Sequence, residues 1–170
     1  MNIIGSILLV LLLIFTIFNL YATFTKKKRD KVNEAKYNAI FAPIDEAIMK
    51  TGKEWKGSKV SRIVTEKEQG IVAVRDDSRT RAIIGWDGGT RMFSYKEYKG
   101  SEISESEEGI SIIVRLEDES LDLKVSDGKF KPKSFVTKSL KSMAESMKSF
   151  LDEIHSLDSK EMTEEKKEQE

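Results

Sequence analysis

Hydrophobic and polar positions divide the chain into three stretches of different periodicity. The first is an apolar run over residues 3–24 that contains no charged residue. As a helix with a rise of about 1.5 Å per residue it would extend roughly 33 Å, which is enough to cross the hydrocarbon core of a bilayer. We therefore predict a single transmembrane anchor over residues 1–25.

The second stretch, residues 60–125, consists of short alternating apolar runs separated by turn clusters at intervals of about 8–12 residues, a pattern typical of antiparallel β structure. The predicted strands are 60–66, 70–75, 80–85, 90–95, 100–105, 109–116 and 120–125. Open edges on an exposed sheet invite aggregation. We therefore expect the strands to form a curled sheet or a small barrel.

The third stretch predicts an amphipathic helix that begins after Ser134 and ends near Leu157. Its apolar positions alternate at spacings of four and three: Val136, Leu140, Met143, Met147, Phe150, Ile154 and Leu157. This spacing also suits a coiled-coil dimer, but Ser139 and Ser146 flank the seam where such dimers use ion pairs. Packing of the helix on the chain's own sheet is therefore favoured, and the charged residues 158–170 are expected to be a disordered tail.

A shorter helix is predicted over residues 43–50. Pro43 suits a first helical position, Gly52 suits a helix stop, and Ile44 and Ile48 share one face that would dock on the domain. The predicted organisation is thus an anchor over 1–25, a basic juxtamembrane linker and helix over 26–42, a soluble domain over 43–157 and a tail over 158–170.

Basic residues follow the apolar run, and only the chain's own amino terminus precedes it. They are Lys26, Lys27, Lys28, Arg29 and Lys31. The positive-inside rule then places the N-terminus outside and the domain in the cytoplasm, at the cell's inner (plasma) membrane. These residues are candidate contacts for lipid headgroups, and the alternative is that they only set orientation. A cleaved signal peptide fits less well, because it carries its charge before a shorter apolar run.

The composition removes several kinds of chemistry. The chain has no cysteine and a single histidine, so disulfides and Cys/His zinc sites are excluded. Nucleophile-elbow, zincin, kinase, Rossmann and phosphate-loop motifs are absent from the sequence. The formal net charge is zero, which argues against a nucleic-acid partner. We predict no catalytic residues, no metal and no cofactor, and an enzyme is the least favoured function.

Two groups of charged residues are candidate contact sites. Residues 102–122 contain eight acids and one basic residue. A candidate partner surface on this acidic edge, expected to face away from an anionic bilayer, comprises Glu102, Glu105, Glu107 and Glu108, with Trp86 beside a glycine-rich turn. The alternative is a solvated strand edge. Arg75, Arg79 and Arg81 could bind an anion, although their neighbouring aspartates are nearer partners.

The segment from Met92 to Glu105, MFSYKEYKGSEISE, has an aromatic strand end and a short turn that leads into an acidic, alternating strand. With the order of about seven strands and one helix, it resembles small bacterial pleckstrin-homology-like (PH-like) domains of unassigned function. The resemblance covers residues 60–157 and implies an α+β fold in which a C-terminal helix closes the sheet. It also implies a binding scaffold without catalysis.

These features together predict a membrane-tethered cytoplasmic adaptor that binds a still unidentified protein partner. The main alternative is a peripheral reader of anionic lipids, which would use the basic linker and the arginine-bearing hairpin. The sequence does not determine the oligomeric state.

Overall fold

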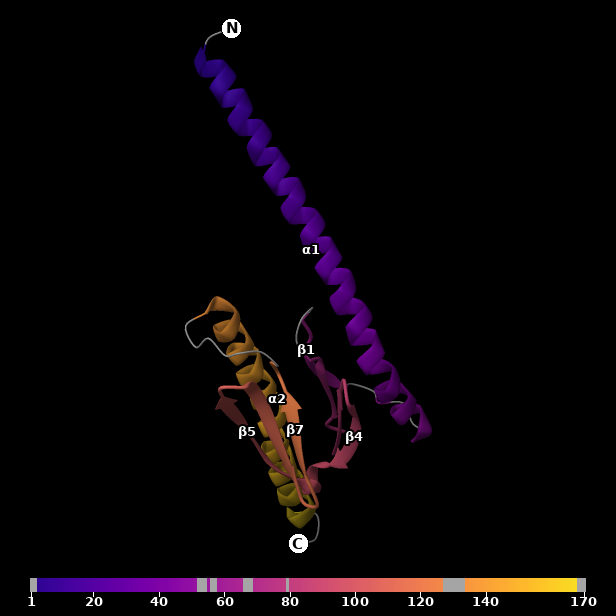
Figure 1. The fold of residues 1–170 in the computed structure, drawn as a ribbon. Helices are drawn as coiled ribbons and strands as arrows, with labels where there is room; N and C mark the ends of the chain where they lie inside the picture. Colours follow the sequence, from indigo (N-terminus) through magenta and orange to yellow (C-terminus); the bar gives the residue numbers. More distant parts are fainter. Residues whose placement is uncertain are drawn as a thin grey trace. The chain divides into compact units, whose positions relative to one another are not determined.

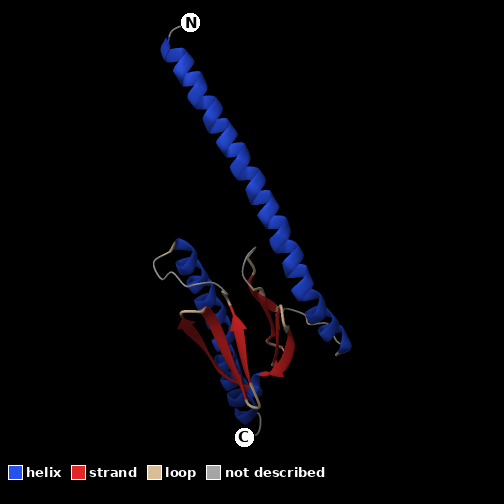
Figure 2. Ribbon diagram, viewed as in Figure 1, coloured by secondary structure: helices blue, strands red, loops and turns tan. Residues whose placement is uncertain are grey.

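The computed structural model describes residues 3–51, 55, 58–65, 69–78, 80–126 and 134–167. The fold is α+β, with a long N-terminal helix, two antiparallel sheets and a C-terminal helix (Figures 1 and 2). The chain divides into two compact units, Met1–Ala35 and Lys36–Glu170. The predicted anchor falls in the first unit, and the sheets and their core belong to the second.

Helix α1 (Ile3–Lys50) runs without interruption through Pro43. The prediction that a separate helix begins at Pro43 is therefore wrong. Residues 26–42, predicted as a basic juxtamembrane linker and helix, are helical throughout. Proline removes one helical hydrogen bond, but packing can outweigh that loss. Ile40 and Ile44, one turn apart, are 4 % and 0 % exposed and pack against the first sheet, so burial holds the helix together across the proline.

Sheet A contains β1 (Lys59–Ile63), β2 (Ile71–Asp76), β3 (Arg81–Trp86) and β4 (Gly89–Ser94), hydrogen-bonded in chain order. Both of its faces are covered, and every residue of β2 is buried. Val72, Val74 and Ile83 pack with Ile40 and Ile44 of α1. On the opposite face, alternate residues such as Ala73 and Ile84 join the main core, which includes residues of the second sheet and the C-terminal helix.

A glycine allows α1 to approach sheet A closely. A Cβ atom on Gly85 would lie 2.7 Å from Cδ1 of Ile44, closer than carbon atoms pack. Gly85 is therefore required by the contact with the helix, not by the strand itself, since glycine weakens a strand interior.

Sheet B contains β5 (Tyr98–Ser106), β6 (Gly109–Leu116) and β7 (Ser120–Lys124), again in chain order. The short 3-10 helix η1 (Tyr95–Glu97) connects it to β4. The Glu97 carboxylate accepts hydrogen bonds from the Ser94 amide at 3.2 Å and the Ser94 hydroxyl at 2.8 Å, which fixes this corner. The prediction of about seven antiparallel strands at these positions is confirmed.

The prediction of one curled sheet or a closed barrel is wrong. Among the strands that the structure describes, none of sheet A pairs with any of sheet B. The reason lies at η1, where the helical turn takes the backbone out of the extended conformation between β4 and β5. Side chains fill the space between the sheets and form the core there.

Helix α2 (Phe135–Lys167) packs its apolar stripe into the main core, as predicted. The buried stripe consists of Leu140, Ala144, Met147, Leu151 and Ile154. It is displaced toward Ala144 and Leu151 relative to the heptad seam, since Met143 is 39 % exposed. Such a wider stripe is typical of a helix that packs on its own domain.

The prediction of a disordered tail from residue 158 is wrong as far as Lys167, because α2 continues to that residue. Glutamate and lysine are good helix formers, and the segment contains no glycine or proline. An absence of apolar periodicity therefore did not mean an absence of helix. Residues 168–170 lie outside the described part of the chain.

Substitution Pro43→Ala tests the account of α1. Pro43 is exposed, and the alanine would restore an amide that can bond to the carbonyl of Ala39. We expect the free energy of unfolding to rise by about 1–3 kcal/mol, measured by denaturation of the full-length protein in detergent with tryptophan fluorescence as the signal. Ala42→Ser, also at an exposed position, is the matched control and should change little. A loss of stability in Pro43→Ala would show that the proline is needed for docking.

Candidate functional site

The predicted headgroup contacts form a collar around α1. Lys26, Lys27, Lys28, Arg29 and Lys31 are all exposed and helical. Because successive residues of a helix are rotated by about 100°, these five side chains point to every side. A helix that lies flat on a membrane carries its charges along one face. The basic collar therefore suits a helix that crosses the bilayer.

The segment that precedes the basic collar is apolar and exposed. Every side chain of residues 10–24 is exposed, including Phe15 at 68 % and Phe18 at 67 %. By length and composition, α1 is long and apolar enough to cross a membrane. Apolar surface on all sides of a helix has no favourable environment in water, but it is satisfied by lipid.

The predicted acidic partner surface is largely neutralised. Glu102 lies 2.7 Å from a guanidinium nitrogen of Arg115, and Glu105 lies 2.6 Å from the Lys141 ammonium group on α2. Glu107 and Glu108 are exposed in the β5–β6 turn and form no ion pair with any described residue. Sheet B thus pairs two of the four glutamates with internal partners and leaves two available.

Of the remaining acids of residues 102–122, three lie in the β6–β7 turn, and Asp122 is exposed on β7. Asp118 and Glu119 lie in the β6–β7 turn, and both pair with Arg91 of sheet A, at 3.1 and 2.6 Å. The β5–β6 and β6–β7 turns lie at opposite ends of β6. The acids are therefore split between the two ends of sheet B, and the expectation of a single acidic edge is wrong. These acids are close together in the sequence, but consecutive turns of antiparallel strands lie at opposite ends of the strand that joins them.

Trp86 has a structural role. It lies in β3, half-buried, and packs against the main core. A Cβ atom on Gly88 would lie 2.7 Å from the indole Nε1, so the glycine turn makes room for the ring. Trp86 belongs to sheet A, whereas the four glutamates belong to β5 and its following turn.

Of the two described arginines of the arginine-bearing hairpin, Arg75 is engaged in the interior and only Arg81 is exposed. Arg75 is buried, with a fully covered side chain. Its Nε donates to Asp77 Oδ1 at 2.6 Å, Nη1 to the Phe150 carbonyl at 2.7 Å and Nη2 to Glu153 Oε2 at 2.7 Å. Its guanidinium carbon also lies 4.7 Å from the centre of the Phe150 ring.

Arg81 is exposed at the start of β3, and Arg79 lies outside the described residues. The sequence named the neighbouring aspartate as a partner of Arg75, but it carried no signal for the two contacts on α2.

We define the Arg75 cluster as Arg75, Asp77, Tyr95 and Glu153. Its hydrogen bonds determine the protonation states of Asp77 and Tyr95. Burial acts to raise the pKa of the Asp77 carboxyl, but hydrogen bonds from Lys59, Tyr95 and Arg75 outweigh it, and the pKa is lowered. Burial, together with the bond to Asp77, raises the pKa of Tyr95, whose hydroxyl donates to Asp77 at 2.7 Å. Asp77 therefore remains ionised and Tyr95 remains neutral, and Arg75 is already satisfied by internal acceptors.

A second polar cluster joins β5 to α2. The Asp152 carboxylate accepts hydrogen bonds from the Tyr98 hydroxyl at 2.7 Å and the Ser101 hydroxyl at 2.9 Å, and it pairs with Lys148. Burial acts to raise the pKa of Asp152, but these donors outweigh it and lower the pKa. His155 is exposed, and its ring lies 5.1 Å from that of Tyr98.

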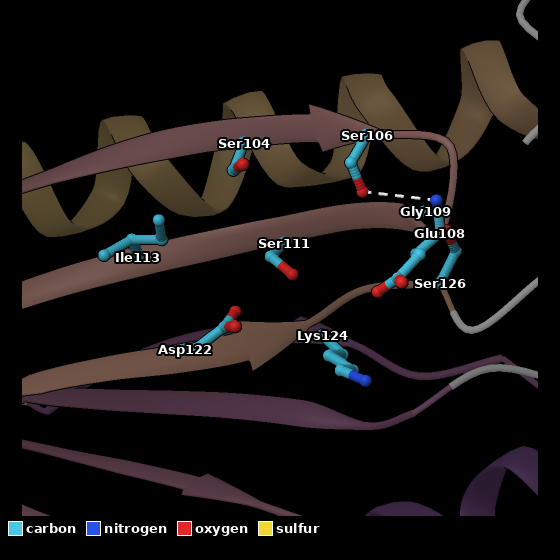
Figure 3. A pocket seen from close by; sticks show the side chains of 9 residues that line it. All are labelled: Ser104, Ser106, Glu108, Gly109, Ser111, Ile113, Asp122, Lys124 and Ser126. Carbon is cyan, nitrogen blue, oxygen red and sulfur yellow. Dashed lines mark hydrogen bonds between the residues drawn. The ribbon is translucent and has the colours of Figure 1, made fainter.

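Sequence reasoning missed a shallow polar depression on the outer face of sheet B (Figure 3). Its lining comprises Ser104, Ser106, Glu108, Gly109, Ser111, Ile113, Asp122, Lys124 and Ser126. Several of these serines lie at outward-facing positions of the alternating strands. That pattern was the sequence feature from which the depression could have been predicted. Its volume of about 130 Å³ is well below that of pockets that enclose small molecules, about 300–1,000 Å³. The depression therefore suits surface contact better than an enclosed substrate.

Within the described residues, no group of three or more histidine, aspartate or glutamate side chains is placed to hold a metal ion. Comparison of the chain with protein-family models, curated proteins and solved structures finds no match.

Substitution Arg75→Met tests whether the Arg75 cluster is structural. It leaves Asp77 and Glu153 without their shared cation, and breaking a buried ion pair costs about 3–5 kcal/mol. We expect a loss of about 3 kcal/mol in the free energy of unfolding of the detergent-solubilised protein, measured by urea denaturation. Arg81→Met, at an exposed position on the next strand, should change stability by less than about 0.5 kcal/mol. Equal effects of the two substitutions would contradict a structural role particular to Arg75.

Proposed function

We propose that the chain is a membrane-tethered interaction module. In this proposal, residues 1–25 cross the plasma membrane with the N-terminus outside, and the folded unit binds a protein partner in the cytoplasm. The observation that carries the proposal is the contrast between two parts of one chain. Residues 10–24 expose apolar side chains on all sides, whereas residues 36–170 form a unit with its own buried core.

The basic collar supports the proposed orientation. Its five cations lie on the C-terminal side of the apolar segment, and cytoplasmic flanks carry such an excess of lysine and arginine. Only residues 32–35 separate the collar from the folded unit, so the tether is short. A short tether raises the effective concentration of the unit for any partner at the same membrane.

The fold supports a binding scaffold. Four strands, three strands and one C-terminal helix follow one another in the order expected for the proposed PH-like domain. The polar depression offers an open face on sheet B. Glu108 lines it and Glu107 is exposed in the same turn, and neither forms an ion pair with a described residue. Polar surface of this kind suits a contact with a protein better than chemistry on an enclosed substrate.

Membrane insertion and orientation are tested in cells. The chain contains no cysteine, so single cysteines report position without background. We expect the full-length protein to resist alkaline extraction from membranes. A membrane-impermeant maleimide should label Asn2→Cys in cells with an intact inner membrane, and Ser149→Cys only after that membrane is permeabilised. Extraction at alkaline pH, or labelling with the opposite pattern, would refute the anchor or its orientation.

The matched control replaces collar residues and leaves the apolar segment intact. The combined substitution of Lys26, Lys27 and Lys28 by glutamine should mix the two orientations, because it removes most of the charge bias. Substitution of Lys96 and Lys99 by glutamine removes exposed lysines from the folded unit and should leave orientation unchanged.

The partner surface is tested by photo-crosslinking in cells. A photoreactive amino acid at Asp122, which is exposed and lines the depression, should produce a discrete crosslinked species in the membrane fraction. The same group at Lys96, exposed on η1 and outside the depression, is the control and should produce none. Identical adduct patterns at the two positions, or no adduct at either, would contradict a partner at this face.

A lipid-reading function is the second candidate, and the basic collar is the observation that favours it. The arginine-bearing hairpin adds little to this alternative because Arg75 is internally paired. Binding of anionic lipid by the collar alone would not require the folded unit.

A further inference from the structure

Helix α2 begins with two exposed apolar side chains. Phe135 is 86 % exposed and Val136 is 61 % exposed, although the helix that follows buries its apolar stripe. Adjacent large apolar residues on the surface of a folded unit indicate a contact with another surface, since their exposure to water is unfavourable.

The start of α2 is held in a defined conformation. The Ser134 hydroxyl accepts a hydrogen bond from the Thr137 amide at 3.1 Å, and the Ser134 carbonyl accepts one from the Lys138 amide at 3.2 Å. Phe135 and Val136 are therefore fixed in a capped first turn. A preorganised apolar pair loses less conformational entropy on contact than a disordered one.

This first turn lies at the end of the unit where the chain enters it. Lys36, the first residue of the unit, lies 3.5 Å from the Asp87 carboxylate in the β3–β4 turn. Arg75 lies toward the opposite end of sheet A, and there it contacts the middle of α2. The chain therefore enters the folded unit at the β3–β4 end of sheet A, which is opposite to the end where Arg75 contacts α2.

The direction of α2 follows from its contacts with β5. Ser101, near the start of β5, bonds to Asp152, whereas Glu105, near its end, pairs with Lys141. The helix is therefore antiparallel to β5, and its first turn extends toward the β5–β6 turn (Figure 1). Since β5 starts at the corner where Tyr95 bonds to Asp77, α2 begins at the far end from that corner.

The sequence on both sides of the first turn of α2 is rich in lysine. Residues 128–144 contain five lysines and no acid, and Lys138 is exposed beside the apolar pair. Lys141 is paired with Glu105, and Glu107 and Glu108 in the β5–β6 turn act against the attraction of an anionic surface. Apolar insertion is therefore expected to supply the larger share of the contact, with lysine adding selectivity for anionic lipid.

We infer that Phe135, Val136 and Lys138 form a second membrane contact, which docks the folded unit on an anionic bilayer. The inference rests on the proposed function, because the anchor must first hold the chain at that bilayer. It adds a site distinct from the basic collar and from the arginine-bearing hairpin. Docking would limit the orientations in which the outer face of sheet B meets a partner.

The test uses the full-length protein with a nitroxide label on Val136→Cys. The protein is reconstituted into vesicles of phosphatidylcholine alone or of phosphatidylcholine mixed with phosphatidylglycerol. We expect the label in the mixed vesicles to be accessible to oxygen and protected from a water-soluble nickel chelate. In phosphatidylcholine alone, protection should fall. A label on Ser149→Cys, at an exposed position farther along α2, should remain open to the chelate in both.

Charge and apolar variants are introduced into the labelled protein. Lys138→Glu should reduce the ratio of docked to undocked unit by about fivefold for each unit of charge, which corresponds to about 1 kcal/mol. Phe135→Ser should also expose the label to the chelate. Lys96→Glu, an exposed charge reversal on η1, is the matched control and should leave protection unchanged.

The outcomes separate this inference from the proposed function. A label open to the chelate in both vesicle types, in protein that resists alkaline extraction, overturns the docking inference and leaves the anchor intact. Protection from oxygen as well as from the chelate indicates burial in a protein contact and also overturns it. Protection that does not depend on phosphatidylglycerol overturns the preference for anionic lipid. Loss of the protein from vesicles at alkaline pH refutes the anchor itself.

Discussion

The buried guanidinium of Arg75 is the interaction on which the folded unit, residues 36–170, depends. It emerges from β2 and contacts a turn carboxylate, a helix carbonyl and a helix carboxylate, so a single side chain joins sheet A to α2. Tyr95, at the corner between the two sheets, is joined to the same cluster because its hydroxyl donates a hydrogen bond to Asp77. A buried cation is costly unless it is fully paired, and here three of its nitrogens are engaged. The position of α2 over the core follows from that requirement.

Sheet A meets a second constraint, because both of its faces are covered. One face packs on α2 and sheet B, while Ile40 and Ile44 of α1 cover the other. The same helix therefore has two environments along its length. Its early residues expose apolar side chains that suit lipid, and its later residues are part of a protein core. Gly85 and the buried isoleucines explain why the helix continues through Pro43, since the energy of docking exceeds the cost of one missing hydrogen bond.

The charged surface illustrates how folding redistributes a sequence feature. Eight acids within residues 102–122 suggested one acidic edge, but the hairpins place them at both ends of sheet B. Arg115, Lys141 and Arg91 then neutralise several of them. What remains open is a small polar depression lined by Glu108, with Glu107 exposed in the same turn. The proposed partner surface is therefore narrower than the sequence suggested, and it is displaced toward the outer face of sheet B.

The sequence by itself determined the elements, because local periodicity reports burial within one strand or helix. The apolar run, the seven strands and the amphipathic helix α2 all lie close to their predicted positions. Tertiary structure alone decided which elements meet. Glu153 lies far along the chain from Arg75, and nothing in the spacing of either residue indicates their contact. The division into two sheets, the uninterrupted α1 and the exposure of Phe135 likewise depend on packing between distant segments, which local patterns do not encode.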